Sequence, residues 1–395
     1  MIDVNALKEK FVDIVGKSNV TDNSFQLDKN STDKTQIKAN PILVVWPTNK
    51  QQIFEIVKVA NKERIPIVPR GGGSGLCGGA VANKSIVINL TKMNRILKID
   101  KRRKYAITQP GIFLDNLSKR INKDNLFFPV QLASHKIATI GGMISTNAGG
   151  EYVLRFGKMS DNIIAIEVVT GDGRLINVRG NKINHFCGTE GLMGIVVEAK
   201  LRLLPKIKRE SATVHEVDTI NDLIKVTEIS IKNKDLIACE FINPKVYKME
   251  GFKKKYFILL EYQNDDGQIH DARLIRKCWK IREDCFTVMF RHKWQIIADP
   301  NVPRKRLKEF LDWCEKKDLP VFGHIGHGTI HVHFKNIRKM EEMYKFVRRL
   351  KGEVTAEHGF GLMKKKYLPE KMRNEFKKLK KIYDRNNVLN PGKVI

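Results

Sequence analysis

A loop almost free of side chains follows a short apolar segment early in the chain. Residues 69–79 read PRGGGSGLCGG, with IPIV before them and SIVINL after them. Glycine allows a backbone to approach a ligand closely, so that several consecutive N–H groups can point at one phosphate. The loop is neither a GxGxxG turn before a helix nor a P-loop closed by GK[ST]. It therefore predicts a phosphate site of another kind.

Two further glycine-rich segments follow the first loop. ASHKIATIGGMISTNAGG spans residues 133–150, and GTEGLMGI spans residues 188–195. In this order the three segments resemble the FAD-binding domain of the PCMH-type flavoproteins, the vanillyl-alcohol oxidase superfamily. They look like the branch that contains glycolate oxidase FAD subunits, D-lactate dehydrogenases and D-2-hydroxyglutarate dehydrogenases. The likeness runs from Ile42 to the terminal Asn390-Pro391-Gly392-Lys393.

The resemblance implies an FAD cofactor and assigns residues to it. The pyrophosphate is expected at the first loop, on Arg70, Gly71, Gly72, Gly73, Ser74 and Gly75. The adenosine and isoalloxazine flanks are expected at Ser134, Gly141, Gly142 and Ser145, with Ile195 near the adenine and Asn390 also in the cofactor site. Members with covalent flavin carry a histidine in the first loop, where this chain has Ser74 and Leu76. Noncovalent FAD is therefore expected.

The pattern of elements predicts an α+β chain in two domains. Up to Pro205, short strands such as 42–47, 65–70 and 85–90 alternate with glycine loops and with helices at 48–63, capped by Thr48, and 114–122. A hairpin is expected at 163–178, with its turn at Gly171-Asp172-Gly173. Residues 1–205 are assigned to a two-part PCMH-type FAD-binding domain.

After Pro205 the pattern of predicted helices and strands changes. Longer helices are expected at 221–232, 266–282, 304–317, 338–350 and 370–386, with strands such as 256–262 between them. Residues 206–380 are assigned to an α/β substrate (cap) domain of the FAD-linked oxidase C-terminal type. Residues 381–395 are expected to form a tail that packs back on the FAD domain.

Histidines are concentrated in one segment of the second domain. FGHIGHGTIHVHF spans residues 322–334 and holds four of the ten histidines. His324 and His331 are seven positions apart, which would place them on opposite faces of a single strand, but glycines at 326 and 328 favour a turn that returns both to one face. Glu357 in the TAEHGFG segment supplies a carboxylate. Imidazoles with a carboxylate suit zinc or a similar divalent ion, although a set of structural histidines is the alternative.

The resemblance adds roles to these residues. The family's GHxGDGNLH and EHGxG segments imply a divalent metal, with zinc expected, on His324, His331 and Glu357, and His358 as the general base. The chain departs from the pattern at His327, where the family has Asp, and at Thr329, where it has Asn. Arg282, in a WKIRE segment, is the candidate for binding a substrate carboxylate, because a guanidinium pairs bidentately with one. An arginine on a helix surface is the alternative.

The composition constrains partners and compartment. The chain has 395 residues and six cysteines without a CxxC pair, so electrons are expected to leave through a separate iron–sulfur subunit, a quinone or a soluble acceptor. No apolar run approaches membrane-spanning length, and the N-terminal sequence lacks a signal-peptide pattern. A cytoplasmic protein is expected. A net charge of +29, in scattered basic runs, is consistent with a generally basic surface, attraction of an anionic substrate or peripheral contact with the inner face of a membrane.

These features favour an FAD-dependent oxidoreductase that converts a D-2-hydroxy acid, of the lactate or glycolate class, to the 2-oxo acid. Another alcohol-oxidising flavoenzyme on the same fold is one alternative. A basic protein that binds nucleic acid without catalysis is the other, and only the net charge supports it. The favoured interpretation includes no nucleic-acid partner.

Overall fold

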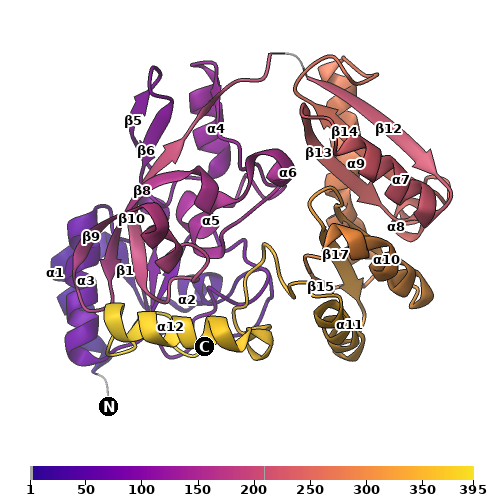
Figure 1. Cartoon of the computed structure of the whole chain (residues 1–395). Coiled ribbons are helices and arrows are strands. Elements are labelled where there is room, and N and C mark those ends of the chain that lie inside the picture. The colour runs from indigo at the N-terminus through magenta and orange to yellow at the C-terminus, as the bar shows by residue number, and fades with distance from the viewer. Residues whose placement is uncertain (1–2, 209) are drawn as a thin grey trace. The chain divides into compact units, whose positions relative to one another are not determined.

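The computed structural model describes residues 3–208 and 210–395 and divides the chain into two compact units (Figure 1). Unit 1 holds Met1–Ala148, Lys158–Lys206 and His358–Ile395. Unit 2 holds Gly149–Gly157 and Ile207–Glu357. Each unit combines helices with sheet, so the α+β class is confirmed.

The chain returns to unit 1 at His358, before the tail predicted at 381–395. Hydrogen bonds explain the early return, because Glu190 accepts from the N–H groups of Phe360, at 2.6 Å, and Gly361. The short segment Gly149–Gly157 belongs with unit 2, although it lies inside the range 1–205 assigned to the first domain.

Unit 1 contains two principal sheets and one small strand pair. The first sheet has the order β1-β2-β4-β3, made of Val20–Thr21, Leu43–Val45, Ile86–Asn89 and Ile67–Arg70, with β4 parallel to both neighbours. The second has the antiparallel order β5-β6-β10-β8-β9, made of Ile96–Asp100, Tyr105–Thr108, Gly194–Arg202, Ile163–Thr170 and Leu175–Arg179. Strands β7 (Leu126–Phe127) and β11 (Leu204–Pro205) form a separate pair.

Helices of unit 1 cover these sheets. They are α1 (Val4–Val15), α2 (Ser24–Ser31), α3 (Lys50–Glu63), α4 (Leu114–Asn122), α5 (Ile140–Thr146) and α12 (Glu370–Tyr383). Buried side chains of α1 and α3 pack with those of the first sheet, and Phe376 and Leu379 of α12 join the core around the second. Figure 1 shows α12, in yellow, among the indigo and purple elements of this unit.

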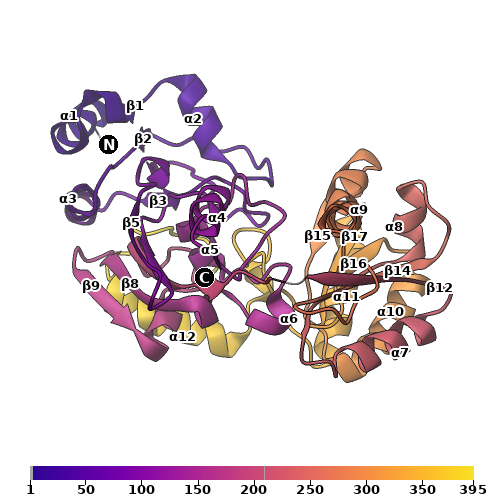
Figure 2. The same ribbon diagram turned by 90° about the horizontal axis from the view of Figure 1, so that it is seen from above.

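Unit 2 is built on a six-stranded antiparallel sheet of order β12-β14-β13-β16-β17-β15. Its strands are Ser211–Val217, Tyr256–Tyr262, Leu236–Ile242, Val321–His324, Thr329–Phe334 and Ile296–Ala298. The helices are α6 (Val153–Phe156), α7 (Ile220–Ser230), α8 (Pro244–Met249), α9 (Ala272–Arg291), α10 (Leu307–Lys316) and α11 (Ile337–Arg349). In Figure 2, α8 and α9 lie on one side of this sheet, and α7 and α10 lie on the other. Strands β13 and β14 are therefore buried on both faces.

Short 3₁₀ helices complete the fold at Lys17–Asn19, Leu90–Lys92, Met159–Asn162, Gly180–His185, Arg304–Arg306 and Lys365–Tyr367. The prediction of Thr48 as a helix cap is wrong by one residue, since the side chain of Asn49 accepts from the N–H of Gln52. No helix within residues 3–208 and 210–395 is both long enough and apolar enough to cross a bilayer.

Candidate functional site

The histidine segment forms a hairpin with its turn at the predicted glycines. Strands β16 and β17 pair antiparallel, with His324 opposite Thr329 and Phe322 opposite His331. Residues opposite each other in an antiparallel pair share a face, and so do residues two apart on one strand. His324 and His331 therefore point from the same face of the sheet, the one that α9 covers.

Glu357 completes a three-residue cluster with these histidines. Its Oε1 lies 3.5 Å from Nε2 of His324, and its Oε2 lies 4.0 Å from Nε2 of His331. One donor atom from each residue lies within 4.8 Å of the other two, and no other such group occurs in the part of the chain that the structure describes. The backbone of Glu357 is fixed by Asp299, which accepts from its N–H at 2.8 Å.

The cluster fits a divalent cation. Ligands at about 2.1 Å from a tetrahedral zinc are roughly 3.4 Å apart, close to the separations between these side chains. Two imidazoles and one carboxylate match the set that catalytic zinc sites use, leaving a position for water or substrate. The backbone of Gly149 also lies close to the cluster, since a Cβ at this position would lie 2.9 Å from Oε1 of Glu357.

A buried glutamate lies behind this cluster. Oε1 of Glu240, in β13, lies 2.7 Å from Nδ1 of His324, and its Oε2 accepts from Nε of Arg282 at 2.8 Å. Burial raises the pKa of Glu240, but His324 and Arg282 outweigh this effect, so its pKa is below the usual value. Burial lowers the pKa of His324, but Glu240 and Glu357 outweigh this, so its pKa is raised. The lowered pKa of Glu240 and the raised pKa of His324 are both expected of an ion pair between these two side chains.

Arg282 is buried, so the alternative of a helix surface arginine is wrong. Only 5% of the residue is exposed, its Nε is bonded to Glu240, and its guanidinium carbon lies 4.8 Å from the ring centre of Phe322. It reaches the histidine face from α9. Its contact with a substrate carboxylate stays a prediction. Because Nε is bonded to Glu240, only the two terminal nitrogens of the guanidinium could make that contact.

The remaining histidines of the hairpin have local partners. Nδ1 of His327 lies 2.8 Å from Oγ1 of Thr329, and Nδ1 of His333 lies 2.9 Å from the carbonyl oxygen of Trp294. Asn301 donates to the Thr329 hydroxyl at 3.3 Å. The two departures from the family pattern, His327 and Thr329, thus contact each other.

His358, the predicted base, follows Glu357 directly in the chain. Unit 2 ends at Glu357, and unit 1 resumes at His358. The role of His358 stays a prediction.

In unit 1 the three glycine segments meet. A Cβ at Gly71 would lie 2.1 Å from Oγ1 of Thr139, and one at Gly72 would lie 1.8 Å from the carbonyl oxygen of Ile137. The third segment joins through Glu190, whose N–H donates to the carbonyl of Ser145 at 2.8 Å. The motifs that carry the resemblance are thus brought together in space.

The first loop suits an anionic phosphate. Within residues 3–208 and 210–395, no protein acceptor is found for the N–H groups of Gly72, Gly73, Ser74 and Gly75. Unpaired N–H groups in a loop of glycines are the donors that a pyrophosphate requires. Arg70 has a different neighbourhood, because its guanidinium donates to the backbone carbonyls of Thr32 and Lys29. It is buried against Gly73, so its charge can act on the loop.

The other predicted cofactor residues lie around this junction. Gly141 donates its N–H to Pro110, Gly142 donates to Thr139, and the hydroxyl of Ser145 donates to Gly141. Ser134 is half-buried in a turn, and Ile195 is in the core beside β4. Asn390 donates to the carbonyls of Gly79, at 3.0 Å, and Glu190, at 2.7 Å.

Sequence reasoning missed two buried glutamates and a lysine. Glu190 ties residues 360–361 to the glycine segments, and Glu240 supports His324. The signal for Glu240 was present, because it is the single charged residue of LIACEFI, a strand apolar enough to be buried on both faces. Lys393 is buried, and desolvation lowers its pKa to about 7 despite the nearby acids Glu190 and Asp33.

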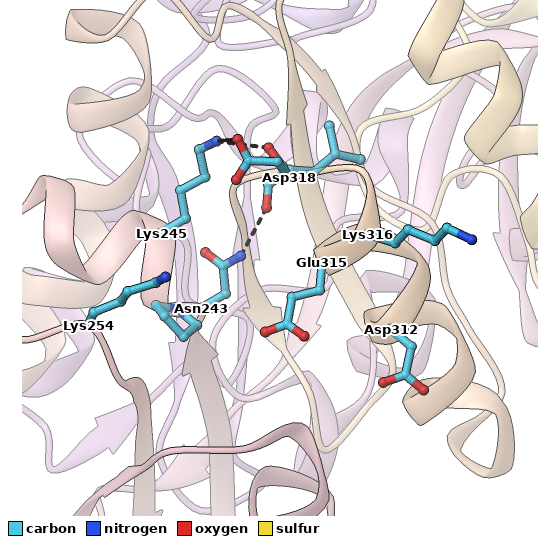
Figure 3. Close-up of a pocket in the computed structure, with 9 residues that line it drawn as sticks. Asn243, Lys245, Lys254, Asp312, Glu315, Lys316 and Asp318 are labelled. Atoms are coloured by element: carbon cyan, nitrogen blue, oxygen red, sulfur yellow. Dashed lines mark hydrogen bonds and ion pairs between the residues drawn. The ribbon is translucent and has the colours of Figure 1, made fainter.

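A separate pocket of about 520 Å³ opens on unit 2 (Figure 3). It is lined by Asn243, Pro244, Lys245, Lys254, Asp312, Glu315, Lys316, Asp318 and Leu319. Asn243 donates to the carbonyl of Leu319, and Lys245 pairs with Asp318. The lining mixes both charges and contains none of the predicted site residues.

Two protein families match the chain. The family described as FAD binding domain matches residues 41–179, and the family described as FAD linked oxidases, C-terminal domain, matches residues 259–394. The first range holds the first two glycine segments, and the second holds the hairpin histidines and Glu357.

Curated relatives match over nearly the whole chain. Glycolate oxidase subunit GlcD of Bacillus subtilis is 30% identical, over 98% of this chain and 96% of the relative. D-lactate dehydrogenase of Archaeoglobus fulgidus is 28% identical, over 90% and 92%. D-2-hydroxyglutarate dehydrogenase of Stutzerimonas stutzeri is 28% identical, over 90% and 91%.

Solved structures share the fold at low identity. A 4-ethylphenol oxidase from Gulosibacter chungangensis has a TM-score of 0.80 at 14% identity, covering 100% of this chain and 97% of that one. An alkyldihydroxyacetonephosphate synthase has a TM-score of 0.73 at 17% identity, covering 98% and 84%. The PCMH-type two-domain fold is confirmed.

Proposed function

Because the chain belongs to the FAD-linked oxidase family, we propose that it oxidises a D-2-hydroxy acid to the 2-oxo acid. The relatives named glycolate oxidase subunit, D-lactate dehydrogenase and D-2-hydroxyglutarate dehydrogenase support this substrate class. The observation that carries the proposal is the cluster of His324, His331 and Glu357, because a cation there can bind a hydroxyl oxygen.

Different residues of the chain have different roles in the proposed oxidation. The oxidation removes a hydride from Cα and a proton from the hydroxyl. FAD, when bound, supplies the hydride acceptor. Arg282 orients the substrate through its carboxylate. His324, His331 and Glu357 would hold a divalent metal, zinc by its ligand set, which would supply polarisation of the hydroxyl. His358 takes the hydroxyl proton, since imidazole titrates near neutral pH.

The first loop holds FAD without a covalent bond. It offers the unpaired N–H groups of Gly72–Gly75 and no histidine, since Ser74 and Leu76 are its larger side chains. Flavin should therefore be released by acid precipitation. Flavin that stays with the precipitated protein would contradict this part of the proposal.

Electrons leave the chain through a separate carrier. The six cysteines include no CxxC pair, and none of the six, all within the described residues, forms a disulfide. A separate iron–sulfur subunit, a quinone at the inner face of a membrane and a soluble acceptor would each serve. Anaerobic dye reduction by the substrate should be fast and peroxide formation in air slow. Rapid stoichiometric peroxide production would instead identify an oxidase.

The central experiment separates metal from flavin. His331→Ala should lose bound metal and turnover but keep FAD, because the glycine loop belongs to unit 1. His358→Asn should keep both metal and FAD and lose roughly 10²–10⁴-fold in turnover. Arg282→Met should mainly raise KM for the carboxylate substrate. His270→Ala is the control, since His270 is an exposed histidine of the same unit.

The measurements are elemental analysis and flavin reduction by D-lactate, L-lactate, glycolate and D-2-hydroxyglutarate. Full flavin reduction by a 2-hydroxy acid in metal-free enzyme would refute the metal's role. Failure of all four acids to reduce the flavin would refute the substrate class.

A further inference from the structure

We propose that Glu240 is a positioning residue, which holds His324 in the tautomer and orientation that bind the metal while it also fixes Arg282. This inference rests on the metal-dependent function proposed above. It adds a residue that lies outside the cluster itself.

The location of Glu240 calls for a specific role. It is 1% exposed in β13, between strands β14 and β16, and all seven residues of β13 are buried. A carboxylate in such a place destabilises the fold unless charged partners surround it. Neighbours such as Ala238 and Ile242 on the same face are apolar. Packing alone therefore gives no reason for an acid at this position.

Each carboxylate oxygen of Glu240 has its own partner. Oε1 lies 2.7 Å from Nδ1 of His324, and Oε2 accepts from Nε of Arg282 at 2.8 Å. An imidazole that donates from Nδ1 to a carboxylate keeps Nε2 free to bind a metal. Nε2 of His324 is the nitrogen that faces Glu357, at 3.5 Å. The hydrogen bond thus selects the nitrogen that the cluster needs.

Glu240 also links the two ends of the proposed substrate site. His324 is on β16 and Arg282 is on α9, so one carboxylate joins the metal ligand to the predicted substrate-binding arginine. The Arg282 cation in turn stabilises Glu240 as an anion. Loss of Glu240 should therefore affect metal binding directly, whereas loss of Arg282 leaves the bond to His324 in place.

A purely structural ion pair is the competing explanation, and Glu261 provides the matched control. Glu261 is 2% exposed in the neighbouring strand β14, and its Oε2 accepts from Nε1 of Trp279 at 2.7 Å. It is thus a second buried glutamate held by a side chain of α9. Its strand lies on the side of β13 away from β16, and its hydrogen bond goes to Trp279 rather than to a metal-cluster residue.

The test is Zn²⁺ affinity of the FAD-loaded full chain, measured by competition with a chromophoric chelator. Glu240→Gln should bind Zn²⁺ about 10–100-fold more weakly than wild type, the usual effect of losing such a partner. Glu261→Gln and Arg282→Met should stay within about threefold of wild type. With Co²⁺ in place of Zn²⁺, Glu240→Gln should also change the visible ligand-field bands.

A second variant serves as the control for misfolding of Glu240→Gln. Because Glu240→Gln leaves the Arg282 cation buried alone, the double variant Glu240→Gln/Arg282→Met removes both charges. It should show the same weakened Zn²⁺ binding as the single variant, with FAD content unchanged.

The outcomes are distinct. Wild-type affinity in both Glu240 variants, or an equal loss in Glu261→Gln, would overturn the role of Glu240 and leave the metal site intact. Absence of Zn²⁺ binding by the wild-type protein would overturn the proposed metal function and this inference with it.

Discussion

A neighbouring segment of the protein leaves no room for a side chain at position 72. A Cβ there would lie 1.8 Å from the carbonyl oxygen of Ile137, so any side chain must push the first glycine segment away from the second. At Gly75 the nearest atom is Oδ2 of Asp33, at 3.2 Å, which a small shift can accommodate. We expect Gly72→Ala to lose most bound FAD and Gly75→Ala to keep more of it. Absorbance near 450 nm per protein measures the difference, and equal retention would argue against this junction.

Lys393 gives the flavin-free protein a distinctive pH dependence. Desolvation lowers its pKa to about 7, opposed by Glu190 and Asp33, whereas an unfolded lysine titrates near 10.4. Between about pH 7 and 10 the unfolded chain therefore holds the extra proton, so stability rises with pH. We expect the wild-type protein to gain stability relative to Lys393→Met from pH 6 to 9. Urea unfolding of both proteins, stripped of flavin, measures this, and a constant difference would contradict the lowered pKa.

Most elements follow from local patterns, and the exceptions have physical causes. Helix α4 and strand β14 have the predicted bounds, because their apolar periodicity is uninterrupted. Helix α9 spans Ala272–Arg291 rather than 266–282, since Asp271 caps its start and its buried residues continue to Met289. The three residues of the cluster, His324, His331 and Glu357, were identifiable from spacing and resemblance. Glu240 was not, because antiparallel pairing of β13 with β16 sets its contact with His324, a residue 84 positions away in the chain.

The hairpin β16–β17 depends on the conformation of one turn residue. Gly328 has φ +91, and a Cβ there would lie 2.4 Å from the carbonyl oxygen of Val302. Gly328→Ala should therefore shift the register that brings His324 to His331, and weaken Zn²⁺ binding by tenfold or more with FAD content unchanged. Gly251→Ala is the control, because Gly251 has φ +94 with no atom nearby. Equal Zn²⁺ affinity in the two variants would show that the hairpin tolerates a Cβ at position 328 and would contradict this prediction.

Across the whole molecule, the last residues of the chain complete the first unit. Ile67 donates its N–H to Val388 and accepts from the N–H of Asn390, both at 2.8 Å, so residues 388–390 pair with the edge strand β3. Strand β3 leads directly into the glycine loop. Asn390 then bonds Gly79 and Glu190, which belong to the first and third glycine segments. The sequence predicts that the tail packs back on the first domain. Its individual contacts could not be predicted, because they depend on pairing between residues far apart in the chain.

Asn390 can therefore be tested as a long-range support of the FAD site. Asn390→Ala removes the donor from a buried carbonyl, that of Glu190, at a cost of about 1–3 kcal/mol, and from the part-buried carbonyl of Gly79. Because the lost hydrogen bonds hold the first and third glycine segments, FAD affinity should drop by roughly tenfold or more. Zn²⁺ affinity in unit 2 should stay unchanged. Asn386→Ala is the matched control, because Asn386 bonds Asn61 at the surface of the same segment. Fluorescence titration of flavin-free protein with FAD measures the effect. Unchanged FAD affinity with a lowered melting temperature would limit Asn390 to a structural role, whereas parallel losses of FAD and Zn²⁺ would mean that the two units do not respond independently.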